Sequence, residues 1–167
     1  MTNYFHDKIQ TVEFDLSSTC NAYCASCNRY VVEDGELKLN PYVNFNQNVS
    51  LEAIEQIFSS PLIDDNVGVP MVGSIGDPIA NPQVVEIFQT ILKHKPSARI
   101  TAHTNGGLRT PEIFEQLGKL SAASNKRVQL YFSIDGLSDT NHIYRAGVIW
   151  EKLIENAKAY IDAGGRA

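Results

Sequence analysis

The chain has 167 residues, of which 43% are hydrophobic, and a net charge of -5 at pH 7. This length and apolar content predict a single domain over residues 1–167 with a substantial core. The acidic balance, without a run of lysines or arginines, argues against a nucleic-acid surface. No apolar stretch reaches membrane-spanning length and no N-terminal leader pattern is present, so we expect a cytoplasmic protein with no membrane partner.

Strands and helices are predicted to alternate along the chain. Apolar runs and period-2 patterns predict strands over residues 11–16, 67–75, 98–104 and 127–134. Capping residues and apolar stripes predict four helices. The first is capped by Ser50, and the second has Asn81 at its N-cap and Pro82 at its first position. The third begins at Thr110-Pro111, and the fourth runs from Trp150 to a stop at Gly164-Gly165. Residues 31–49 are polar and aperiodic, which predicts a surface connection.

This alternation predicts an α/β fold of four parallel β/α units with the helices outside. Ligands of such sheets gather at the carboxyl ends of the strands. The predicted strands end in a cysteine loop, Gly76-Asp77-Pro78, Asn105-Gly106-Gly107 and Asp135-Gly136. Gly, Asn and Asp also form ordinary turns, so the prediction of a site depends on their coincidence with the cysteines at one edge.

The last two strands are predicted to have one apolar and one polar face. Val128, Leu130, Phe132 and Ile134 are expected to meet the helices. The opposite face carries Thr101, His103 and Asn105 from one strand and Gln129, Tyr131, Ser133 and Asp135 from the other. Such a polar inner face suits a cofactor cavity. For His103 itself we expect an interior histidine with satisfied hydrogen bonds rather than a catalytic group.

All three cysteines of the chain, Cys20, Cys24 and Cys27, lie in one loop at CxxxCxxC spacing. Three thiolates can hold three corners of a [4Fe-4S] cluster and leave the fourth iron open to a ligand that is not protein. Two alternatives remain: inert buried thiols, and a zinc site completed by a histidine. An odd count at short spacing argues against a disulfide framework. The candidate fourth zinc ligands are His6, His94, His103 and His142.

The loop and the exit turns resemble the radical S-adenosylmethionine (radical SAM) superfamily. Cys20, Cys24 and Cys27 match its cluster motif, and Gly76-Asp77-Pro78 lies where the family carries a Gly-Glu-Pro-type motif. Ser133-Ile134-Asp135-Gly136 with Tyr144-Arg145, together with Thr104-Asn105-Gly106, is similar to the SPASM/twitch-like branch of anaerobic sulfatase maturases and peptide-modifying enzymes.

The resemblance implies the roles of the site residues. The three cysteines would bind a [4Fe-4S] cluster whose fourth iron is chelated by S-adenosylmethionine (AdoMet). Gly76, Asp77 and Pro78 would position the methionine end of AdoMet, and Ser133 and Arg145 would bind its carboxylate. Asn105 and Asp135 are further candidates for cofactor binding.

The same resemblance implies the reaction. One electron from the reduced cluster cleaves AdoMet to methionine and a 5'-deoxyadenosyl radical, which abstracts hydrogen from a peptide or small-molecule substrate. An electron donor such as flavodoxin or ferredoxin is expected as a partner. A non-catalytic iron-sulfur or zinc-binding α/β module is the alternative, although a pure electron carrier normally has four protein ligands.

Three features depart from the family pattern. Ser26 stands before the third cysteine in place of a common aromatic residue, so adenine stacking from that position is not expected. Asp77 replaces the more usual glutamate. The chain stops after Gly164-Gly165-Arg166-Ala167, where a fifth strand is expected to begin, which predicts a partial barrel lacking strands five and six. We therefore expect the N-terminal portion of a longer protein, or a truncated product, with residues 130–134 as an exposed edge.

Overall fold

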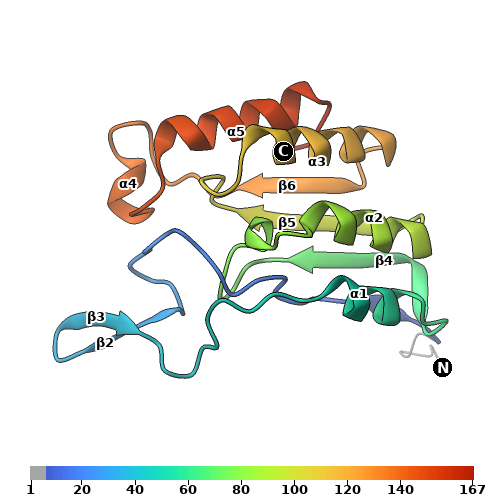
Figure 1. Cartoon of the computed structure of the whole chain (residues 1–167), viewed down its shortest axis with the longest axis horizontal. Helices are drawn as coiled ribbons and strands as arrows, with labels where there is room; N and C mark the ends of the chain where they lie inside the picture. The colour runs from blue at the N-terminus through green and yellow to red at the C-terminus, as the bar shows by residue number, and fades with distance from the viewer. Residues whose placement is uncertain (1–6) are drawn as a thin grey trace, which may run out of the picture.

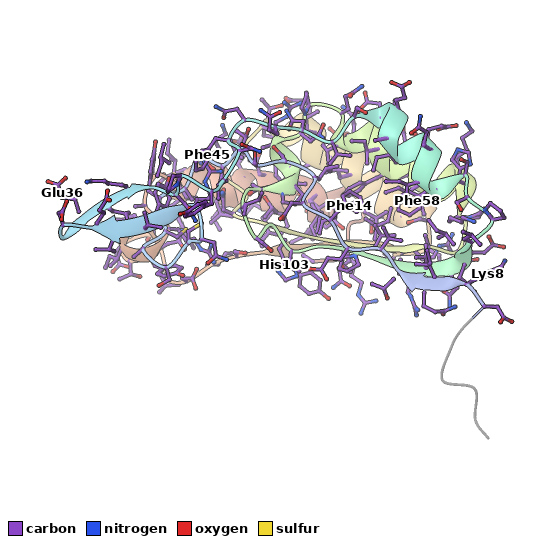
Figure 2. The ribbon with its side chains drawn as sticks, turned by 90° about the horizontal axis from the view of Figure 1, so that it is seen from below. Lys8, Phe14, Glu36, Phe45, Phe58 and His103 are labelled. Atoms are coloured by element: carbon purple, nitrogen blue, oxygen red, sulfur yellow. The ribbon has the colours of Figure 1, made fainter. Side chains whose placement is uncertain are left out.

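A four-stranded parallel sheet with helices on one face is the centre of the fold (Figures 1 and 2). The computed structural model describes residues 7–167. The strands lie in the order β1-β4-β5-β6, and all three pairings are parallel. They span Ile9–Thr11 (β1), Ile63–Met71 (β4), Arg99–Thr104 (β5) and Val128–Phe132 (β6). The predicted α/β fold of four parallel β/α units, a partial barrel, is confirmed.

The helices follow the predicted order and cover one face of the sheet. They are α1 (Leu51–Phe58), a 3-10 turn η1 (Pro78–Ala80), α2 (Val84–His94), α3 (Pro111–Ala123), a short α4 (Asn141–Tyr144) and α5 (Trp150–Asp162). The hydroxyl of Ser50 accepts a hydrogen bond from the amide of Ala53, as the N-cap prediction requires. None of the helices within residues 7–167 combines the length and apolar character needed to cross a bilayer.

The two faces of the sheet differ as the period-2 pattern predicts, except that Ile134, which was expected to meet the helices, follows the end of β6 and is 43% exposed. Four side chains of β5 and β6 are fully buried beneath the helices: Ile100, Ala102, Val128 and Leu130. On the other face, the rings of His103 and Tyr131 stack with centroids 4.8 Å apart. Figure 2 shows His103 on the side of the sheet away from the helices. The expectation of an interior histidine is wrong, because no described element covers this face and His103 is exposed.

The first two strands lie further toward the N-terminus than predicted. Pairing of β1 with β4 has an irregular register, and the amide of Val12 makes the last contact to β4, through the carbonyl of Gly68. Beyond it, Leu16 turns inward and is 1% exposed. The strand β4 begins four residues before the predicted start and ends at Met71, because Gly73 has a φ of +70° that breaks the extended chain.

The predicted surface connection over residues 31–49 contains a β-hairpin. Strands β2 (Tyr30–Glu33) and β3 (Glu36–Leu39) pair antiparallel and project beyond the carboxyl edge of the main sheet (Figure 1). Their two-residue turn has positive φ at both Asp34 (+56°) and Gly35 (+81°). An Asp-Gly pair between apolar residues is typical of such turns, so the sequence contained a signal for this hairpin.

The last strand, β6, has a partly covered edge. Arg166 forms a parallel bridge with Gln129, and the amide of Leu130 donates to the carbonyl of Arg166 at 3.2 Å. Further along, Tyr131 and Ile134 are 42% and 43% exposed. Of the edge predicted over residues 130–134, Tyr131 and Ile134 are therefore exposed, whereas Phe132 and Ser133 are partly buried and Leu130 is covered.

Asn81 does not cap α2 as predicted but cross-links three segments. The helix starts at Val84, and the buried Asn81 amide group donates to the carbonyls of Leu16 (3.1 Å) and Val49 (2.9 Å). Its Oδ1 accepts from the amide of Gln83 at 2.9 Å. The side chain thereby holds the end of the first strand segment, the approach to α1 and the approach to α2 together.

Replacing Asn81 by alanine is expected to lower the free energy of unfolding by about 1–3 kcal/mol, because buried backbone groups lose their partners. Chemical denaturation followed by circular dichroism measures the change. The matched control is Asn66→Ala, at an exposed position in β4, for which we expect a change within about 0.5 kcal/mol. Equal losses in both variants would contradict the cross-linking role.

Candidate functional site

The carboxyl ends of the strands and the cysteine loop form one cavity. In Figure 1 the arrowheads of β4, β5 and β6 point to the same edge, where the blue cysteine segment and α4 lie. Eight of the ten predicted site residues line this cavity: Cys20, Cys24, Cys27, Gly76, Asp77, Asn105, Ser133 and Arg145. The other two, Pro78 and Asp135, are not among its lining residues. Four segments far apart in sequence therefore meet at one site.

The cysteine loop is anchored by apolar and backbone contacts. Cys24 is 7% exposed and packs with Ala22, Val148 and Leu153. The amide of Tyr23 donates to the carbonyl of Ala146 at 2.8 Å. These contacts attach the cysteine loop to the segment before α5 and to the first turns of that helix.

Hydrogen-bond donors face two of the three sulfur atoms. Cys20 Sγ accepts from the Ala22 amide and from Asn105 Nδ2, each at 3.4 Å. Cys24 Sγ lies 3.6 Å from Arg145 Nη1. Burial raises the pKa of the Cys20 thiol, and the Ala22 hydrogen bond opposes that shift. Donors of this kind favour thiolate, the form in which cysteine binds metal.

Gly76 allows the turn after β4 to touch the start of the cysteine loop. A Cβ at this position would lie 2.0 Å from the carbonyl oxygen of Ser17 and 2.7 Å from Ser18 Cα. The neighbouring Asp77 amide donates to the carbonyl of Thr19 at 2.9 Å. Glycine is therefore required here by close backbone approach.

Asp77 is a buried brace between two exit turns. Its Oδ2 accepts from Thr104 Oγ1 and from the Asn105 amide, both at 2.9 Å, and its Oδ1 accepts from the Ile79 amide at 2.9 Å. Burial raises the pKa of the Asp77 carboxyl, and these three hydrogen bonds oppose the shift. With both oxygens engaged, this carboxyl fixes the positions of backbone groups around the cavity.

Asn105 connects the exit of β5 to the cysteine loop. Its Nδ2 donates to Cys20 Sγ and, at 2.9 Å, to Asn21 Oδ1, while its Oδ1 accepts from the Gly107 amide at 2.7 Å. The side chain is 5% exposed. Its amide therefore acts on the cysteine loop directly, a role that the periodicity of the strand alone did not indicate.

Arg145 reaches the cavity from the loop after α4. Its Nε pairs with Asp135 Oδ2, and Asp135 is itself held through its amide by Asn141 Oδ1 at 3.0 Å. This pairing leaves Nη1 of the guanidinium facing Cys24 Sγ. Asp135 thus orients Arg145 from outside the cavity.

Arg29 also lines the cavity and was not identified from the sequence. Its side chain is 7% exposed, and its Nη1 donates to the carbonyls of Ser18 (2.6 Å) and Ile75 (3.3 Å). Arginines are mostly exposed in folded proteins, so nothing in the local pattern distinguishes this one. Its burial depends on two turns that meet only in the folded chain.

The positions of the cysteine and histidine side chains can be compared with what a zinc site requires. Within residues 7–167, no three His, Cys, Asp or Glu side chains lie close enough together to hold one metal ion. Of the candidate histidines, His103 lines the cavity, His94 ends α2, His142 lies in α4, and His6 falls outside the described residues. A single zinc ion needs ligands that converge on one point, whereas a cluster takes each thiolate on a separate iron. The donor set fits a cluster better.

A parallel β/α sheet with a three-cysteine loop at its carboxyl edge defines a class of cofactor-dependent enzymes. A sequence profile of the radical SAM superfamily matches residues 15–167, and the chain belongs to this superfamily. Its members are enzymes that use a [4Fe-4S] cluster and AdoMet. The family predicted from the cysteine loop and the exit turns is thereby confirmed.

One relative is the AdoMet-dependent heme synthase of Methanosarcina barkeri (strain Fusaro / DSM 804), which is 30% identical over an alignment of 135 residues that covers 78% of this chain and 32% of that protein. Among solved structures, the anaerobic sulfatase maturase anSMEcpe with bound AdoMet aligns with a TM-score of 0.68 at 16% identity, over 95% of this chain and 41% of that one. The structure of the same maturase with AdoMet and the Cp18Cys peptide aligns with a TM-score of 0.65 at 14% sequence identity. The chain thus spans about a third to two fifths of these proteins.

Replacing Gly76 by alanine is expected to lower the free energy of unfolding by roughly 1–3 kcal/mol, because the added methyl group collides with backbone. Thermal and chemical denaturation measure the change. Gly68→Ala in β4 is the control, since a Cβ there meets neighbours only at 3.7 Å or more. Wild-type stability of the Gly76 variant would show that the two segments do not touch as described.

Proposed function

We propose that Cys20, Cys24 and Cys27 hold a [4Fe-4S] cluster with an open iron that binds AdoMet. The observation that carries this proposal is that the three thiols line one cavity with Asn105, Arg145 and other predicted cofactor residues, while the chain has no fourth cysteine. When bound, the cluster supplies the electron that cleaves AdoMet to methionine and a 5'-deoxyadenosyl radical, for hydrogen abstraction from substrate.

Each residue of the cavity has a distinct task in this proposal. Arg145, oriented by Asp135, offers a planar pair of donors to the carboxylate of AdoMet, and Ser133 adds a hydroxyl. The turn at Gly76 presents backbone groups to the methionine amino group, while Asp77 keeps that turn rigid. Asn105, a further candidate for cofactor binding, donates to Cys20 Sγ and so acts on the cluster ligand.

The substrate proposed is a peptide, with a small molecule as the second candidate. The peptide proposal is supported by the fold shared with a maturase whose structure contains a peptide, and the relative that acts as a heme synthase favours the second. A flavodoxin or ferredoxin is proposed as the electron donor.

Anaerobic reconstitution with iron and sulfide is expected to give a reduced cluster whose electron paramagnetic resonance spectrum changes on addition of AdoMet. The single variants Cys20→Ser, Cys24→Ser and Cys27→Ser should each lose most of the bound iron, because no other cysteine can replace the ligand. Zinc bound tightly in place of iron, or a spectrum indifferent to AdoMet, would contradict the proposed function.

Replacing Arg145 by glutamine is expected to weaken AdoMet binding about ten- to hundredfold, since hydrogen bonds between charged groups contribute roughly 1.5–3 kcal/mol. Equilibrium binding to the reconstituted protein measures the dissociation constant. Asp135→Asn should give a smaller loss in the same direction, because it only loosens the guanidinium. Arg109→Gln, whose guanidinium contacts the carbonyl of Pro82, is the control with the same change in charge. A Kd for Arg145→Gln equal to that of the control excludes the assigned role.

A further inference from the structure

Arg29 is a buried cation with no anionic partner among the described residues. Its guanidinium makes no ion pair within residues 7–167, and its Nε is buried without a hydrogen-bond partner there. The Phe45 ring lies 5.0 Å from the guanidinium carbon and covers it. Burying an uncompensated charge costs several kcal/mol, so such a group points to an anion that the folded protein is built to receive.

Of the anions expected in the cavity, the cysteine thiolates are the ones that stay in place when AdoMet leaves. Arg29 and the three cysteines line the same cavity. Among the residues that line the cavity, Asp77 carries the one carboxyl, and both of its oxygens are engaged by Thr104, Asn105 and Ile79. Three thiolates around an iron-sulfur core leave a net negative charge, and reduction adds one more.

We propose that Arg29 is a positioning residue whose fixed positive charge stabilises the reduced cluster and raises its reduction potential. This inference rests on the proposed cluster site. The two carbonyls on Nη1 and the stacked Phe45 hold the guanidinium in place, so its charge acts on the cluster without reorganisation when an electron arrives.

The test is an anaerobic redox titration of the reconstituted full chain, followed by electron paramagnetic resonance. At a fixed potential near the wild-type midpoint, Arg29→Gln should lower the ratio of reduced to oxidised cluster about tenfold, which is about 59 mV for a one-electron couple. Arg29→Lys, which keeps the charge, should recover most of the shift. The control Arg99→Gln removes an equal charge from an exposed site at the start of β5, the end opposite the cavity.

A second pair of variants covers the case in which Arg29→Gln does not fold or does not hold iron. Phe45→Glu places a carboxylate against the guanidinium and should lower the reduced fraction relative to Phe45→Gln. Phe45 is only partly buried on a surface segment, so both variants are expected to fold.

The outcomes separate the two proposals. A cluster in the wild-type protein with equal potentials in the Phe45 pair, or in wild type and Arg29→Gln, overturns the role of Arg29 and leaves the proposed function standing. Equal shifts in Arg29→Lys and Arg29→Gln would also overturn it, because the effect would then be structural. A wild-type chain that holds no cluster overturns both.

Discussion

The contact between residues 17–19 and residues 75–77 is the constraint on which the site depends. Gly76 lies so close to Ser17 that any side chain would collide with backbone, and the Asp77 amide bonds the Thr19 carbonyl. Arg29 joins the same two segments through the carbonyls of Ser18 and Ile75. Because this contact directly precedes the first cysteine, it sets where the cysteine loop leaves the sheet and therefore where the thiols lie relative to the other strand ends.

Asp77 extends this constraint to the next strand. Its carboxyl is hydrogen-bonded to Thr104 and to the Asn105 amide, and the Asn105 side chain returns to Cys20. Hydrogen bonds thus connect the start of the cysteine loop to the exit of β4, the exit of β4 to the exit of β5, and the exit of β5 back to the cysteine loop. An aspartate, one methylene shorter than the glutamate common in the family, suffices here because the β4 and β5 exits approach within direct hydrogen-bonding distance of its oxygens.

The predictions from sequence succeeded where local signals and the global fold agree. Strand-helix alternation, the Ser50 cap and the coincidence of four exit turns each follow from short-range rules, and the cavity contains most of the predicted residues. Errors arose where tertiary contacts override those rules: Asn81 resembles an N-cap but bonds the carbonyls of Leu16 and Val49. The Asp34-Gly35 hairpin was missed although its turn chemistry was present. Arg29 could not be found at all, because its burial results from segments almost fifty residues apart in the chain.

The two arginines that line the cavity differ in whether a carboxylate pairs with them. Arg145 has its own counterion, because Asp135 pairs with Nε, while Nη1 faces the cavity. Such a group can bind a carboxylate, and its positive charge is still paired with Asp135 after the ligand leaves. Arg29 makes no ion pair among the described residues and is 7% exposed, and two backbone carbonyls and the Phe45 ring hold its guanidinium in place. A tethered, partly neutralised guanidinium suits reversible binding, whereas a fixed and unpaired one suits a permanent anion. The difference in pairing therefore separates a guanidinium that can take up and release an anionic ligand, Arg145, whose Nη1 also lies 3.6 Å from Cys24 Sγ, from the fixed guanidinium of Arg29.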